Sequence, residues 1–320
     1  MIQTSKFELP RAFAAFSPAN PPPRITTLVL PMMFTIDDEK FLRKEIFNSV
    51  TVTFMNSLAR TFFSGRKENQ FKEVRFLSEE ANTTWEEISK VAFDLPRGWY
   101  ELSRISPQDR VEFTRDFWLD RMPYHPSAHP GFFEFFEQLD DVAVVLMRRV
   151  EDEPMDAELV YSLADNSSFF RGRPPCTETD IQELKNEIDV SLPRDFLSFL
   201  RIHNGFGKLS EMGLLEAQEI ADTKRRVVDL FLKTEKRIKS GEVDVDPGAL
   251  IPFYEVLGLS SFQCFFSDWY PGSEMGNVYL SGIDYTISDV SNKKSWAENL
   301  AFPTFSEWLQ LYLEGMNLCT

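Results

Sequence analysis

The spacing of apolar residues predicts helices and strands along most of the chain. Ser106 followed by Pro107 is typical of a helix start, because proline is favoured at the first helical position, and apolar residues recur after it with helical spacing. Two apolar runs, 142–150 and 158–163, predict strands that the acidic loop 151–156 joins into a hairpin. We therefore expect a helix-rich α+β N-terminal half.

The second half repeats this mixture. Thr177, with Asp180 three residues later, predicts a capped helix, and Pro193 predicts the start of the next one. One amphipathic helix is expected over 220–240 and a closing helix over 305–313. Apolar runs between them predict three strands, at 250–254, 262–266 and 276–280.

Residues that break regular structure divide the chain into three parts. Six prolines in residues 1–31 predict an extended arm, because each fixes φ and removes a hydrogen-bond donor. A run of turn residues over 166–175 has no periodicity and predicts a boundary. We therefore expect an N-terminal α+β domain of unknown family at 32–168 and a second domain at 176–315, since 320 residues exceed the usual single core.

The composition is globular and acidic. Hydrophobic residues make up 43% of the chain and the formal net charge is −16. An acidic surface repels phosphate backbones, which predicts a basic polypeptide partner and no nucleic acid, although solubility alone also explains such a charge. The most apolar run, 28–36, is too short to span a bilayer and no export signal is evident. We expect a cytoplasmic protein without membrane insertion.

Motifs that carry chemistry are scarce. The sequence has no glycine-rich phosphate loop, nucleophile elbow or zinc-protease motif, and its three cysteines are widely spaced. His125 and His129 have metal-like spacing, but Pro126 interrupts the helix that would aim both rings at one ion. We expect no catalytic residue, metal or cofactor. An enzyme, the alternative, would have its site around Arg121, Tyr124, His125 and His129.

Charge is distributed unevenly in the second half. Residues 224–239 are rich in Lys and Arg, whereas residues 242–320 hold 11 acidic and 2 basic side chains. One interpretation is a solvated helix face beside an acidic sheet. The other is an acidic surface that contacts a basic partner through aromatic anchors. The second interpretation gives four candidate partner-binding residues: Asp268, Trp269, Tyr270 and Glu274.

Four motifs occur in order in the second half: a capped acidic helix, LPRDFLSFLRIHNG, LIPFY with FQCFFSDWYPGSEMGNVYL, and TFSEWLQLYLEG. Together they resemble the SUKH superfamily, which groups Smi/Knr-type cell-wall regulators, Syd-like proteins and toxin-immunity proteins. Its members usually have a second glycine directly after NG, where this chain has Phe206. The resemblance covers about 140 residues of the C-terminal half. The residues that carry its central motif are Leu192, Pro193, Phe196, Phe199, Asn204 and Gly205.

This resemblance implies a mostly antiparallel sheet flanked by helices, with no active site, used to bind polypeptides. The motif residues themselves indicate structural roles, because a Leu-Pro pair fixes a helix start and Asn-Gly tolerates positive φ. Three hypotheses follow: immunity-type sequestration of a toxin or effector, a regulatory scaffold that docks a signalling or cell-envelope protein, and an enzyme. The sequence predicts neither the partner's identity nor the oligomeric state.

A possible internal repeat links the two halves. LPRGWYELSRI at 95–105 aligns without gaps to LPRDFLSFLRI at 192–202, and a pair of strand patterns follows each segment. Two interpretations are open. The N-terminal half is a diverged copy of the second half, or the similarity is chance, since no Asn-Gly follows Ile105.

Overall fold

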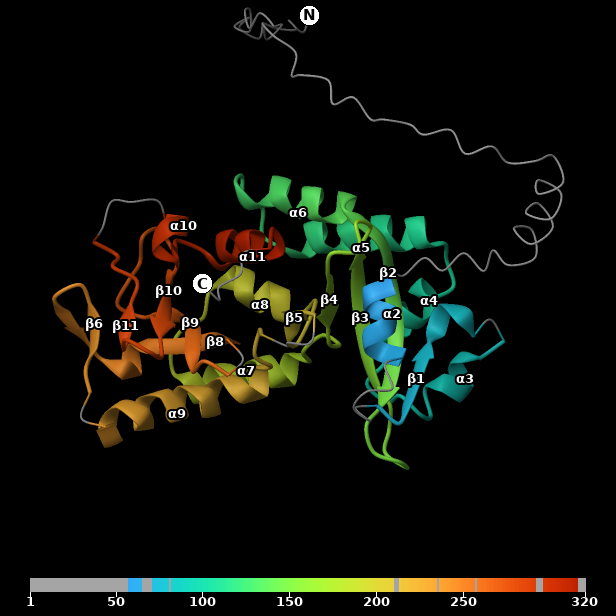
Figure 1. Ribbon diagram of the computed structural model, residues 1–320, viewed down its shortest axis with the longest axis horizontal. Helices are drawn as coiled ribbons and strands as arrows, with labels where there is room; N and C mark the ends of the chain where they lie inside the picture. Colours follow the sequence, from blue (N-terminus) through green and yellow to red (C-terminus); the bar gives the residue numbers. More distant parts are fainter. Residues whose placement is uncertain are drawn as a thin grey trace, which may run out of the picture. The chain divides into compact units, whose positions relative to one another are not determined.

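A computed structural model describes residues 57–64, 71–80, 82–209, 213–234, 236–256, 258–291 and 296–315, except the side chain of Trp296. The predicted arm at 1–31 and the apolar run at 28–36 lie outside these residues. The described residues all belong to one compact unit (Figure 1).

Helices of the first half precede and cover a long hairpin. Ser106 caps the helix at Pro107, as predicted, by accepting a hydrogen bond from the Asp109 amide. Thr84 caps α3 and Pro96 precedes α4. The helices are α2 (Ser57–Ser64), α3 (Trp85–Ile88), α4 (Arg97–Leu102), α5 (Pro107–Arg121) and α6 (Ala128–Glu137).

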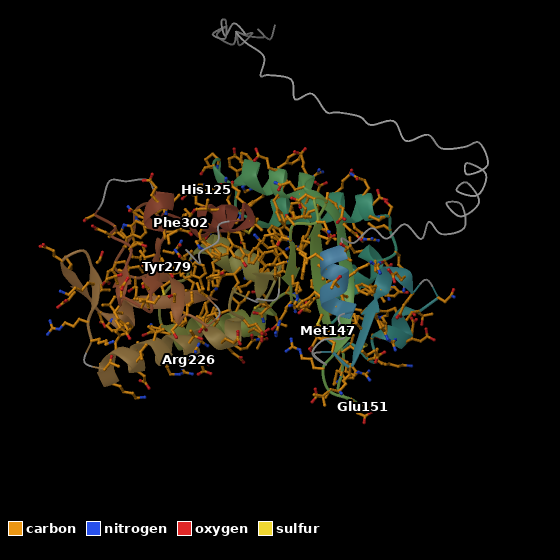
Figure 2. All side chains as sticks on the ribbon, in the orientation of Figure 1. His125, Met147, Glu151, Arg226, Tyr279 and Phe302 are labelled. Atoms are coloured by element: carbon orange, nitrogen blue, oxygen red, sulfur yellow. The ribbon has the colours of Figure 1, made fainter. Side chains whose placement is uncertain are left out.

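The hairpin predicted in the first half is confirmed. β2 (Leu139–Arg148) and β3 (Asp156–Leu163) pair antiparallel, and the acidic loop with Glu151 forms the tip (Figure 2). β1 (Glu73–Phe76) pairs with β2, and β4 (Phe169–Gly172) pairs with β3. The turn residues after β3 therefore connect β3 and β4 into a second hairpin.

β4 lies between the two predicted domains and is bonded to both sides. It pairs with β3 and also with β5 (Phe206–Lys208), which follows the Asn204-Gly205 motif. Leu214 continues the ladder by bridging Phe206 to Tyr254 in β8. The limits at 168 and 176 stay a prediction, but the segment between them is a strand and not a free linker.

The second half has a largely antiparallel sheet of its own, in the order β7-β6-β11-β10-β9-β8, with β12 also paired to β10. Only β6 and β11 pair in parallel among the described strands. The strands are β6 (Ile238–Ser240), β7 (Val243–Val245), β8 (Leu250–Val256), β9 (Ser261–Phe266), β10 (Asn277–Ser281), β11 (Thr286–Ile287) and β12 (Ala301–Phe302).

Among the described residues of the second half, five α-helices accompany this sheet. The expectation of one helix over 220–240 was wrong, because the helix ends at Thr234 and Ile238 begins β6. The closing helix is confirmed. The helices are α7 (Glu178–Ile188), α8 (Arg194–Leu200), α9 (Ala217–Thr234), α10 (Trp296–Asn299) and α11 (Phe305–Leu313).

These elements confirm the α+β fold class and the mostly antiparallel sheet of the second half. Leu95-Pro96 and Leu192-Pro193 both precede helices, and β2–β3 and β9–β10 are both antiparallel pairs. The connections differ, because β1 comes before its Leu-Pro helix and β8 comes after. The repeat stays a hypothesis. Within the described part of the chain, no helix is both long and apolar enough to cross a membrane.

One hydrophobic core extends through both halves. Trp118 of α5 is fully buried and contacts aromatic rings from before and after β4, among them Phe136, Phe199 and Phe206. Phe206, the residue in place of the second glycine, is itself fully buried. The departure from the usual motif therefore supplies a core ring at the start of β5.

A buried hydrogen-bond chain crosses this core. His203 Nδ1 lies 2.9 Å from the Arg173 carbonyl, which can only accept, so this nitrogen carries the proton. Nε2 then accepts from the Tyr161 hydroxyl at 2.6 Å, and the Tyr161 oxygen accepts from Trp118 Nε1 at 3.1 Å. Burial raises the pKa of Tyr161 and lowers the pKa of His203 to about 4. The imidazole is neutral in the folded protein.

Acid should therefore destabilise the fold through His203. Between its ordinary pKa of 6.5 and about 4, the unfolded chain binds a proton at this site that the folded chain does not. The contribution of neutral His203 is complete above pH 6.5 and is lost as pH falls, by at most about 1.4 kcal/mol per pH unit. Thermal unfolding of the wild type and of His203→Gln between pH 7 and 4 measures it.

The difference between the two proteins isolates this site from the buried carboxyls. Burial raises the pKa of Asp195 and of Glu216, so protonation of these groups acts in the opposite direction in both proteins. The wild type should lose stability more steeply with acid than His203→Gln. Parallel pH profiles would show that His203 does not titrate in this way.

Candidate functional site

The loop from Asp268 to Glu274 connects β9 to β10 and is fastened at both ends. The Trp269 amide donates to the Phe266 carbonyl at 3.0 Å, and the Trp269 carbonyl accepts from the Gly276 amide at 2.9 Å. The indole covers Gly276 so closely that a Cβ there would lie 2.5 Å from Trp269 Cε3. Trp269 is therefore a half-buried side chain that holds the loop against the sheet.

The four predicted partner-binding residues divide into two pairs. Glu274 is half-buried, and its carboxylate accepts a hydrogen bond from the Arg194 amide at 2.9 Å at the start of α8. Glu274 and Trp269 thus have structural contacts within the chain. Asp268 is exposed, and the Tyr270 side chain is 53% exposed. These two side chains are presented to solvent by a loop that their neighbours hold in place.

Glu274 also lines a cleft of about 450 Å³, which we call the Glu274 cleft. Its walls come from four places in the chain: residues 123–125, 194–195, 272–274, and 303–304 with 306–307. The first segment joins α5 to α6, and the others are the start of α8, the loop before β10 and the start of α11. Residues about 150 positions apart thus meet in one polar site.

Hydrogen bonds join the first wall to the last. Ser127 Oγ donates to Glu307 Oε1 at 3.2 Å and lies 3.0 Å from His125 Nδ1, which then carries the proton. The His125 amide donates to His129 Nδ1 at 3.1 Å, so this nitrogen of His129 is already occupied. Figure 2 shows His125 beside the red C-terminal helix, α11.

Asp195 forms part of the cleft wall and links α8 to α11. Its carboxylate accepts from the Ser306 amide at 2.8 Å and from Ser306 Oγ at 2.9 Å. The carboxylate is buried, and burial raises its pKa. Sequence reasoning missed this residue, because a single polar position in an apolar helix has no pattern that sets it apart from a surface residue.

Few side chains in the cleft, or elsewhere among the described residues, are suited to catalysis or metal binding. His125 and Tyr124 of the enzyme alternative lie in the cleft, whereas Arg121 packs its guanidinium 5.3 Å from the Phe117 ring centre. Burial raises the pKa of both described cysteines, to about 12 for Cys176, so these thiols are poor nucleophiles near neutral pH. No group of three His, Cys, Asp or Glu that could hold a metal occurs among the described residues.

The basic stretch after residue 224 is balanced locally. Arg226 pairs with Glu255, Lys233 with Asp229, and Arg237 with Asp244. Lys236 lies 3.8 Å from the ring centre of Tyr285. These contacts are those of a solvated basic face stabilised by its own charge pairs, and their partners lie outside the 268–274 loop.

The motif residues of the second half have the geometry that the resemblance implies. Leu192 is buried, Pro193 precedes α8, and Phe196 and Phe199 are at most 1% exposed. Residues 175–311 match the model of the SMI1 / KNR4 family (SUKH-1). This match confirms the resemblance for the C-terminal half. No curated protein matches the chain.

The SUKH-1 segment, residues 175–311, supplies most of the Glu274 cleft but not all of it. The side chain of Asn204, near the end of the central motif, accepts a hydrogen bond from the Ala217 amide at 2.7 Å and so holds the start of α9. Gly205, the next residue, has a φ of +97°. The segment also contains the 268–274 loop and the start of α11. Tyr124 and His125 lie outside it. The first half of the chain therefore completes a site built mainly by the SUKH-1 segment.

Proposed function

We propose that the chain is a non-catalytic protein that binds a basic polypeptide and acts by immunity-type sequestration of a toxin or effector. The observation that carries the proposal is the 268–274 loop, where exposed Asp268 directly precedes fastened Trp269 and exposed Tyr270 lies between Trp269 and Glu274. Aromatic side chains on ordered surfaces are frequent binding hot spots. Acidic neighbours speed association with a basic partner.

The charge of the surrounding sequence supports the same partner. Residues 242–320 hold 11 acidic and 2 basic side chains, so this region attracts cations and repels nucleic acid. The SUKH-1 match supports polypeptide binding. A cytoplasmic location, without membrane insertion and without a cofactor, belongs to the same proposal.

Two alternatives differ in what the site does. A regulatory scaffold would use the same contacts, but its signalling or cell-envelope partner would stay active when bound. The polar cleft around His125 is the observation that favours an enzyme. Inhibition of the partner's activity at a one-to-one ratio distinguishes sequestration from scaffolding.

Kinetics with a purified partner test the proposed surface. Tyr270→Ala should raise the dissociation rate about tenfold if the ring is a hot spot worth about 1.4 kcal/mol. Asp268→Lys should mainly slow association, as should 1 M salt, because the Debye length falls from about 10 Å at 0.1 M to about 3 Å. Stopped-flow or surface-based measurements separate the two rates.

A charge reversal far from the loop is the matched control. Glu151 lies at the tip of the β2–β3 hairpin, at the opposite side of the molecule from His125 (Figure 2). Glu151→Lys changes the net charge as Asp268→Lys does and should affect association less. Rates that neither Tyr270→Ala nor Asp268→Lys changes would place the binding surface elsewhere.

A further inference from the structure

The wall of the Glu274 cleft that lies outside the SUKH-1 segment carries an unusually exposed ring. Tyr124 is 78% exposed, yet hydrogen bonds hold the residues that directly follow it. The amide of His125 donates to His129 Nδ1, the His129 amide donates to the His125 carbonyl at 3.0 Å, and Ser127 bonds to Glu307 of α11. Pro123 and Pro126 on either side restrict the backbone further. A ring on such a loop loses little conformational entropy when a ligand covers it.

The charges of the cleft favour a cation. Glu274 and Glu307 are half-buried carboxylates in its lining, with buried Asp195 beside them, against Arg194 and His125. A carboxylate can accept about four hydrogen bonds. Among the described residues, Glu274 accepts from the Arg194 amide and Glu307 from Ser127 and Thr304, which uses only part of that capacity.

Anions are disfavoured for a specific reason. The starts of α8 and α11 both face the cleft, and helix starts often attract anions. Here the chain's own carboxylates already accept from these amides, Glu274 from Arg194 and Asp195 from Ser306. A phosphate or carboxylate ligand would have to displace them.

We propose that the Glu274 cleft binds an arginine side chain of the polypeptide partner, and this inference rests on the proposed function. The guanidinium would pair with Glu274 and Glu307 and stack on the ring of Tyr124. Arginine fits better than lysine, because its planar fork bonds carboxylates in parallel and stacks on aromatic faces. About 450 Å³ accommodates a long side chain with adjoining backbone.

Capped tripeptides titrated into the full-length chain test the proposal. Acetyl-Gly-Arg-Gly-amide should give saturable NMR shifts at residues 124, 273 and 307, and the citrulline peptide, which has the same shape without charge, should give none. The lysine peptide should bind at least about threefold more weakly than the arginine peptide. Free arginine should bind no more tightly than the arginine tripeptide. Tyr124→Ala should weaken arginine binding about threefold to fivefold.

Charge variants provide the matched comparison. Glu307→Gln keeps a side chain that can accept the Ser127 hydrogen bond but removes the charge, and it should weaken binding at least threefold. Glu314→Gln makes the same change at the other end of α11 and should bind as the wild type does. Thermal unfolding of each variant verifies the fold. Equal binding of the arginine and citrulline peptides, or equal effects of the two Gln variants, would overturn the arginine site.

The outcomes separate this site from the proposed function. If the peptide fails to bind while Tyr270→Ala and Asp268→Lys still change the partner's rates, the arginine site is wrong and the function stands. If the peptide binds as expected while those rates are unchanged, the arginine site stands and the loop is not the partner's surface. Tighter binding of free arginine than of the tripeptide would overturn the assignment to a polypeptide.

Discussion

Replacing Trp118 by alanine is expected to lower the free energy of unfolding by about 3–5 kcal/mol. The indole is fully buried, and its ring centre lies 5.4 Å from that of Phe136 and 5.3 Å from that of Phe199. Phe136 precedes β4 in the sequence and Phe199 follows it. The cavity left behind would therefore open in a core that both halves share, and both halves should lose stability in a single transition.

Denaturant unfolding followed by circular dichroism measures the loss, and hydrogen exchange of amides in β3 and β9 reports on each half. Phe113→Ala is the matched control, because Phe113 lies on the same helix but is 60% exposed. It should change stability by no more than about 0.5 kcal/mol. Two separate transitions, with β9 unaffected by Trp118→Ala, would show that the halves fold independently.

Removing Glu158 should be about as costly, roughly 3–5 kcal/mol, because it leaves a buried cation without its partner. Glu158 and Arg171 have side chains only 2–3% exposed, joined by two parallel hydrogen bonds of 2.6 Å. The Arg171 guanidinium also lies 4.9 Å from the ring centre of Phe62. Glu158→Ala, measured by denaturant unfolding, tests this.

A double variant separates the loss of the pair from the burden of an unpaired charge. Glu158→Leu combined with Arg171→Met removes both charges and should recover most of the stability. Glu101→Ala breaks an exposed pair with Arg97 and should cost less than about 1 kcal/mol. If the double variant is as unstable as Glu158→Ala, the loss of stability comes from packing and not from the unpaired charge.

Local signals were sufficient to predict where several helices begin. Ser106 and Thr177 cap their helices as their sequences indicate, because a cap depends on residues within one turn. Ile238 shows where this reasoning fails. It continues the helical stripe of α9, yet it pairs with β7 and lies in a sheet whose other strands come later in the sequence. Such non-local pairing overrides a local pattern.

The Glu274 cleft could be predicted only in part, for the same reason. The sequence singled out the 268–274 loop from its charge and aromatic residues, and it named Tyr124 and His125 only as an enzyme alternative. Nothing in the linear pattern indicates that Tyr124, Glu274 and Glu307 meet, because the folded core brings them together. The contacts that Trp269 and Glu274 make within the chain could not be predicted either. The sequence does not distinguish a Trp or Glu that binds a partner from one that holds its own loop in place.

The place of β4 limits what the SUKH-1 segment can do alone. A fragment of residues 175–311 would keep β5 but lose β4, the strand that pairs with it on that side. The edge of β5 would then be open to pairing with other molecules. Phe199 and Phe206 would also lose their contacts with the Trp118 indole, which would expose an apolar patch beside that edge. We therefore expect the SUKH-1 segment to aggregate more readily as a fragment than it does beside the first half of this chain.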